Sequence, residues 1–137
     1  MSKQINMDAQ QKFGEAVNTG NFEFFDDVVA PGAVDNDPAA GQAPGPEGYK
    51  DFFSGMRAAF PDFKVTVEHM VADDDNVSFA YTATGTHEGE FNGIPATHKK
   101  IKIRGMQISR FANGKMVERW GSSDELGLLK QIGAQIG

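Results

Sequence analysis

Hydrophobic positions follow a helical period in the first sixty residues of the chain and a strand period after that. Apolar side chains recur every three or four residues in three segments, residues 7–18, 22–29 and 46–59. This spacing places apolar groups on one side of a helix, so the pattern predicts three helices in succession. Residues 30–46 are rich in Pro, Gly and Ala, and we expect a long loop there that closes over a pocket, with room for a short strand only at residues 33–35.

After Pro61 apolar and polar residues alternate. Four alternating segments cover residues 63–71, 77–83, 99–111 and 116–120, and turn sequences such as Asn113-Gly114 separate them. The alternation predicts four successive antiparallel strands, and a last apolar run at helical spacing predicts a short C-terminal helix. Helices followed by strands indicate an α+β fold in which helices cover one face of a curved antiparallel sheet. A length of 137 residues fits a single domain.

Composition narrows the function classes. With 39% hydrophobic and 23% charged residues the chain has the make-up of a folded globule, and its net charge of -6 argues against nucleic-acid binding. The chain contains no cysteine, and its three histidines lack metal-site spacing, so we expect no metal and no thiolate chemistry. The sequence has no run of 18 apolar residues and no apolar N-terminal region, which predicts a cytoplasmic protein without a membrane span.

Asp124 stands between the last strand and the last helix. Asp or Ser immediately before an apolar helical segment commonly caps the helix, and Ser123 or Asp124 fits that role. A carboxylate at the same junction can also face a cavity and move a proton between carbon and oxygen. Both interpretations are compatible with the sequence.

Aromatic and polar residues on the strands are further candidates for a pocket. His87 has the parity of Tyr81, so it is either a pocket residue or an ordinary rim or core histidine. Tyr81 and Trp120 are either core residues or the wall of a ligand pocket. Glu118 has the parity of Trp120 and is either a second acid or the partner of Arg110 or Arg104 across a hairpin.

Four sequence strings in order, AFPDF, GTHEGEFNGIPAT, the segment GM-x-x-x-RF-x-x-GK-x-x-E-x-W and the acidic ending at Asp124, resemble the SnoaL-like polyketide cyclase (ester cyclase) family. The likeness extends from about residue 11 to residue 133. The family belongs to the nuclear transport factor 2-like superfamily. The resemblance implies a cone-shaped, highly curved sheet closed by three N-terminal helices, a cystatin-like α+β barrel, that assembles as a homodimer through the sheet.

The resemblance also implies a site. The family's cyclases close a ring of a polyketide methyl ester by an intramolecular aldol reaction without a cofactor, and Asp124 matches their acid/base aspartate. Asn36 matches a polar pocket position and is a candidate donor to an enolate oxygen, although it also fits an Asx-turn. The cyclases carry polar groups, including a histidine, on the strand before Trp120. Here that strand offers Gln107 and Ser109 in one register or Arg110 in the other, and no histidine.

Two functions follow as hypotheses. The first is a cofactor-independent cyclase, isomerase or hydrolase that acts on an apolar carbonyl compound, with Asp124 and Asn36 as catalytic residues. We expect six residues to bind the substrate: Gln107, His87, Trp120, Tyr81, Phe13 and Phe53. The second is a non-catalytic dimeric module that holds an apolar small molecule, since one fold can serve both purposes.

Overall fold

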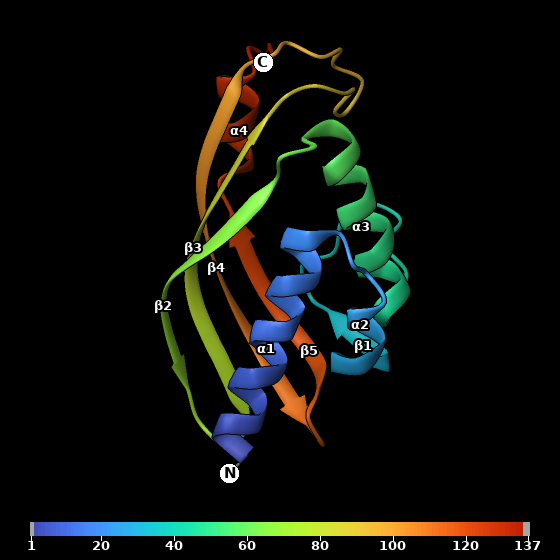
Figure 1. The fold of residues 1–137 in the computed structure, drawn as a ribbon, viewed down its shortest axis with the longest axis vertical. Helices are drawn as coiled ribbons and strands as arrows, with labels where there is room; N and C mark the ends of the chain where they lie inside the picture. Colours follow the sequence, from blue (N-terminus) through green and yellow to red (C-terminus); the bar gives the residue numbers. More distant parts are fainter. Residues whose placement is uncertain (1, 136–137) are drawn as a thin grey trace.

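The computed structural model describes residues 2–135 and has the α+β architecture that the sequence predicts (Figure 1). Its elements in chain order are α1 (Ser2–Thr19), α2 (Phe24–Val28), β1 (Val29–Asp35), α3 (Pro46–Ala59), β2 (Lys64–Ala72), β3 (Asn76–Thr86), β4 (Lys100–Ala112), β5 (Lys115–Ser123) and α4 (Glu125–Gln131). The third predicted helix has the predicted bounds, and Pro46 occupies its first turn, where the missing N–H of proline costs nothing.

The strands form one sheet in the order β1-β5-β4-β3-β2. The pairs β2–β3, β3–β4 and β4–β5 are antiparallel, as predicted. The edge strand β1 is longer than the three residues expected from the sequence, and it pairs with β5 in parallel. Local alternation did not reveal this strand because Pro31 and Gly32 interrupt its apolar pattern and its partner lies far away in the sequence.

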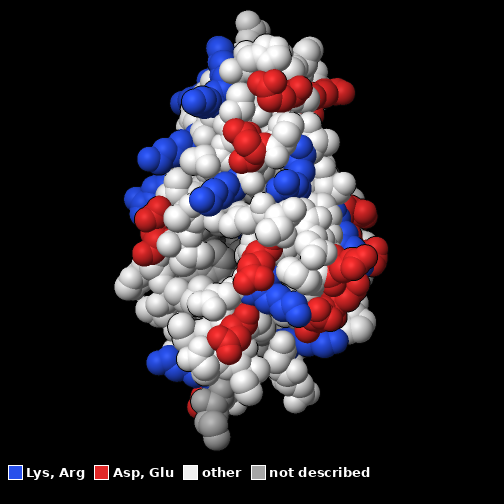
Figure 2. Space-filling model, in the orientation of Figure 1, with Lys and Arg blue, Asp and Glu red and all other residues white. Residues whose placement is uncertain are grey.

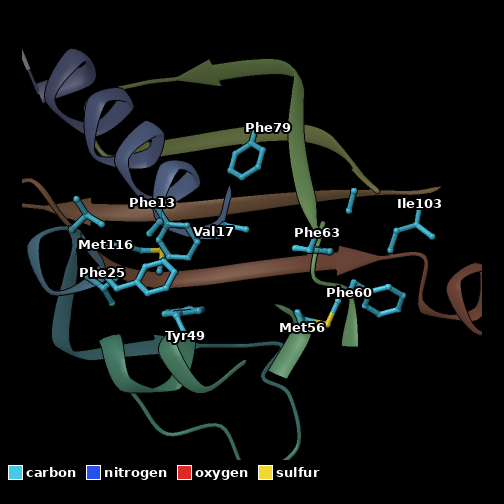
Figure 3. Packing of buried hydrophobic residues seen from close by; sticks show 14 of the residues in the cluster. Phe13, Val17, Phe25, Tyr49, Met56, Phe60, Phe63, Phe79, Ile103 and Met116 are labelled. Carbon is cyan, nitrogen blue, oxygen red and sulfur yellow. The ribbon is translucent and has the colours of Figure 1, made fainter. Parts of the chain in front are cut away.

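One face of the sheet packs against the helices. Along β4 every second residue is buried from Ile101 to Phe111, so the inner and outer faces of this strand are unambiguous. Helices α1 and α3 lie over the inner face, and the strands curve around them (Figure 1). The core side chains form one cluster, with Phe13, Phe25 and Tyr49 toward one end and Met56 and Phe60 toward the other (Figure 3).

The outer face of the sheet carries exposed apolar side chains. Five of them are large: Val34, Val71, Met106, Ile108 and Trp120. Across the face that bears the helices, Lys and Arg are interspersed with Asp and Glu (Figure 2). No helix within residues 2–135 is both long enough and apolar enough to cross a membrane.

Candidate functional site

A cavity of about 1290 Å³ lies between the inner face of the sheet and helices α1 and α3. Its wall is largely apolar and aromatic, and it includes four of the residues that the sequence predicts for substrate binding: Phe13, Phe53, Tyr81 and Gln107. Burial raises the pKa of the Tyr81 hydroxyl, so this group stays protonated and neutral. A cavity with these dimensions and an aromatic wall fits a flat ligand of several rings.

Polar groups concentrate at one part of the cavity, where β1 and β5 lie side by side. The parallel register pairs Asp35 with Arg119. The Arg119 Nη1 atom lies 3.2 Å from Asp35 Oδ1 and 3.1 Å from Oδ2. The side chain of Asp35 is 6% exposed and that of Arg119 is 17% exposed, so this ion pair is largely shielded from water. The opposite charges of the two side chains offset each other in this position.

Arg119 also orients the polar residues of β4. Its Nε donates a hydrogen bond of 3.0 Å to Gln107 Oε1, and Gln107 Nε2 donates one of 3.1 Å to Ser109 Oγ. The register question for this strand is therefore settled: Gln107 and Ser109 face inward. Arg110 faces outward, where its guanidinium lies 3.1 Å from Glu118 Oε1. The sequence alternative that pairs Glu118 with Arg110 is confirmed.

Tyr49 and the loop before α3 complete the surroundings of Asp35. The Tyr49 hydroxyl donates to Asp35 Oδ2 at 3.0 Å, and Gln42 Nε2 lies 3.4 Å from the same oxygen. Burial, reinforced by the neighbouring Asp35 carboxylate, raises the pKa of Tyr49 far above that of a free phenol. Tyr49 is therefore a permanent hydrogen-bond donor to Asp35 at neutral pH.

Two glycines make room for this arrangement. A Cβ atom at Gly121 would lie 2.3 Å from Arg119 Nη2, so the guanidinium occupies the space of the missing side chain. A Cβ atom at Gly105 would lie 2.3 Å from the Tyr81 hydroxyl oxygen. Arg119 Nη2 makes no hydrogen bond to any residue that the structure describes, and both Arg119 and Gly121 line the cavity. This nitrogen is therefore a donor available to a ligand.

Asp124 lines the cavity at a different place, where β5 ends. It is the N-cap of α4: its Oδ1 accepts a hydrogen bond of 2.8 Å from the Gly127 amide, and the residue is exposed. The capping role that the sequence suggested is thus present in the structure. Asp124 follows Arg119 by five positions, so their Cα atoms are about 16 Å apart at the usual rise per residue of a strand. Oδ2 of Asp124 accepts no hydrogen bond from the described residues and remains a free acceptor.

Asn36 does not join the other candidates. Its Nδ2 donates to Glu118 Oε2 at 3.1 Å and to the Arg119 carbonyl oxygen at 3.1 Å, on the exposed side of the β1–β5 pair. Asn36 is absent from the residues that line the cavity, and the inward position belongs to its neighbour Asp35. Asn36 and Asp35 are neighbours in the chain, so their side chains point to opposite faces of the sheet. The sequence alone did not show which of the two faces the cavity.

Trp120 and His87 also lie outside the cavity wall. Trp120 is 39% exposed on the outer face, opposite Ile108. The sequence places Trp120 on the face of Met116 by simple alternation, but the register of β5 shifts after Met116, and the resulting bulge turns Arg119 inward and Trp120 outward. His87 is fully buried against the ring of Phe60, and its Nδ1 lies 2.9 Å from Thr97 Oγ1, so the core-histidine alternative describes it.

Sequence reasoning did not select Asp35 and Arg119, the central pair of the site. The alternation along β5 places Arg119 on the face opposite to Glu118 and Trp120. To conclude from this that Arg119 points inward, one would have needed to know that β5 contains a bulge. Within residues 2–135 no three His, Cys, Asp or Glu side chains gather as a metal site would require.

A large pocket with one polar part, enclosed by a curved sheet and helices, defines a small-molecule pocket protein. The family model for the SnoaL-like polyketide cyclases matches residues 7–132, and the chain belongs to that family. At 26% identity the chain is similar to the aklanonic acid methyl ester cyclase DauD of Streptomyces sp. (strain C5), over 97% of this chain and 83% of the relative.

Solved structures agree with this assignment. The structure of IdmH from Streptomyces antibioticus is similar with a TM-score of 0.81 and 34% identity, over 94% of this chain and 99% of that chain. TsrD from Streptomyces laurentii has a TM-score of 0.87 at 24% identity, over 96% of this chain and 97% of that chain, and this likeness concerns the fold alone. The predicted family and the predicted cone-shaped α+β fold are both confirmed.

Proposed function

We propose that the protein is a cofactor-independent cyclase that closes a ring in a polyketide-type carbonyl compound by an intramolecular aldol reaction. The observation that carries the proposal is the free Nη2 donor of Arg119, held by Asp35 and Gln107 in the wall of a largely apolar cavity. A fixed donor in such surroundings stabilises negative charge as it develops on a carbonyl oxygen. The name of the relative DauD, an aklanonic acid methyl ester cyclase, supports a methyl ester as the substrate class.

The reaction needs a base and an oxygen-binding group, and the cavity offers both. Asp124 Oδ2 takes a proton from a carbon next to a carbonyl, and the electron pair of that C–H bond forms the enolate. The enolate carbon attacks a second carbonyl of the same molecule, a C–C bond forms, and the carbonyl π pair moves to oxygen. That oxygen takes up the proton, so product and substrate have the same mass. Arg119 Nη2 binds the enolate oxygen, the task that the sequence had suggested for Asn36.

Arg119 and Asp124 both line the cavity, and the Arg119 guanidinium lies against Gly121, three positions before Asp124 and about 10 Å of extended chain from it. The enolate oxygen is bonded to the carbon next to the one that loses its proton. The substrate must therefore lie between Nη2 of Arg119 and Oδ2 of Asp124 and contact both. Gln107, fixed by Arg119 and Ser109, offers its amide edge on the Arg119 side of the substrate.

The test is incubation with aklanonic acid methyl ester, followed by liquid chromatography and mass spectrometry. We expect a product of unchanged mass and altered retention, formed without added cofactor. Asp124→Asn should lose most of this activity, since an amide keeps the helix cap but is no base. Asp51→Asn, an exposed carboxylate of α3 outside the cavity, is the matched control and should retain activity. Full activity of Asp124→Asn would contradict the assignment of the base.

A non-catalytic binding module is the second candidate. The exposure of Asp124 and its engagement as a helix cap favour this alternative, because a base for carbon acids is usually shielded from water. Saturable binding of the ester by calorimetry, with no conversion during prolonged incubation, would establish the binding module and overturn the cyclase.

We also propose the homodimer through the sheet that the resemblance implies. The exposed apolar side chains of the outer face, among them Met106, Ile108 and Trp120, support a partner there. Light scattering at micromolar concentration should give the mass of two chains, and Met106→Glu should give one. A wild-type monomer would overturn this proposal. The cytoplasmic location stays a prediction, and cell fractionation tests it.

A further inference from the structure

The charges that line the cavity are unbalanced. Among the described lining residues, acidic side chains outnumber basic ones by five to one: Glu15, Asp35, Asp37, Asp124 and Glu125 against Arg119. A ligand that carries a negative charge therefore meets repulsion from several carboxylates. Among these described lining residues, Arg119 is the one cation that could offset this repulsion.

Arg119 is not free to act as a cation toward a ligand. Both oxygens of Asp35 lie within 3.2 Å of its Nη1, and the pair is largely buried, so its charge is already neutralised inside the protein. The other partner of the guanidinium, Gln107, is neutral. Nη2 offers directional N–H groups without a net attractive charge, which suits a ketone or ester oxygen and gives a carboxylate little compensation for its lost hydration.

We propose that the Asp35–Arg119 pair is the specificity determinant of the cavity, and that it selects the esterified, neutral form of an aromatic carbonyl ligand over the free carboxylate. Asp35 acts here by cancelling a charge, and Arg119 acts by presenting a donor. The proposal takes its ligand class from the proposed function. It concerns only which charge state the cavity binds, and it requires no turnover.

A matched pair of inert probes tests the selection. Anthraquinone-2-carboxylic acid and its methyl ester share a flat ring system, differ in charge at about pH 7.5, and have no enolisable C–H group that could react. We expect the wild-type protein to bind the ester at least about tenfold more tightly by calorimetry or fluorescence. Equal affinity, tighter binding of the acid, or binding of neither probe would overturn the proposal.

Variants locate the effect. Asp35→Asn uncovers the Arg119 charge, so the affinity ratio should move toward the acid by at least about tenfold. Adding Arg119→Gln removes that charge again and should restore the ester preference at lower affinity for both probes. Asp51→Asn, outside the cavity, should leave the ratio unchanged. An unchanged ratio in folded Asp35→Asn would show that the pair does not set the specificity.

A measurement on the wild-type protein remains decisive if Asp35→Asn fails to fold. Raising the salt concentration screens the carboxylates, so the affinity for the ester divided by the affinity for the acid should fall toward one at high salt. An affinity ratio independent of salt would contradict the proposal. The result is separable from catalysis. Probe selection without cyclisation of aklanonic acid methyl ester would remove the proposed function alone, and cyclisation without probe selection would remove only this inference.

Discussion

Removal of the Arg119 guanidinium should destabilise the fold strongly, although Arg119 faces a cavity. In Arg119→Met the Asp35 carboxylate, 6% exposed as a side chain, loses its counter-ion. Breaking a buried pair from one side costs about 3–5 kcal/mol. Asp35 keeps its hydrogen bonds from Tyr49 and from the Asp37 amide, so we expect the lower end of that range, about 3 kcal/mol.

Urea unfolding followed by the fluorescence of the single tryptophan, Trp120, measures this loss. With a denaturant dependence of about 2 kcal/mol per molar, the midpoint should fall by about 1.5 M. Asp35→Asn combined with Arg119→Met should be more stable than Arg119→Met alone, because the double variant leaves no unpaired charge.

Arg110→Met is the matched control, since Arg110 forms an ion pair of the same 3.1 Å length with Glu118 on the outer face. The side chains of that pair are 48% and 26% exposed, so water screens their interaction and we expect only a marginal change. Equal losses in Arg110→Met and Arg119→Met would refute the argument that burial decides the strength of these pairs.

Three further predictions concern single side chains. Gly121→Ala should displace the Arg119 guanidinium, because the new Cβ would lie 2.3 Å from Arg119 Nη2. Calorimetry should then show about tenfold weaker binding of the ester. Gly32→Ala, whose Cβ would meet no atom within 4 Å, should bind the ester normally. The pKa values of Tyr49 and Tyr81 are both raised by burial, so the tyrosinate absorbance of the folded protein should appear above the pH of free tyrosine. The contribution of these two tyrosines to the free energy of unfolding should be constant below about pH 10 and fall as pH rises beyond it; ordinary tyrosine titration in the folded state would contradict this. Asp124→Ala should lower the free energy of unfolding by about 1 kcal/mol through loss of the cap, and Asp124→Asn should not; equal stability of the two variants in urea would exclude a stabilising cap.

The order of the elements was predictable because their signals are local. Pro46 and the apolar stripe after it define α3, and the alternation over residues 99–111 predicts β4 without deciding which of its faces points inward. A resemblance carried by ordered strings then supplied the curvature of the sheet and the presence of a pocket, neither of which is encoded in any short segment.

The contents of the pocket were less predictable, since they depend on non-local pairing. Asp35 faces inward only because β1 joins β5 in a parallel register, and Arg119 faces inward only because β5 has a bulge after Met116. Alternation without that bulge assigns Trp120 to the wrong face. A one-residue difference likewise moves the polar role at the end of β1 from Asn36 to Asp35.

The loop between β1 and α3 is tied to the polar part of the cavity at several points. The Asp37 amide donates to Asp35 Oδ1, Gln42 reaches Asp35 Oδ2, and Asp37 Oδ2 accepts from the Gly121 amide at 2.8 Å. A ligand that strengthens or loosens the Asp35–Arg119 pair therefore changes the order of this loop, and by reciprocity the order of the loop changes the affinity for the ligand. Amide hydrogen exchange of residues 36–45 is thus a direct readout of cavity occupancy, even for a ligand that makes no contact with the loop.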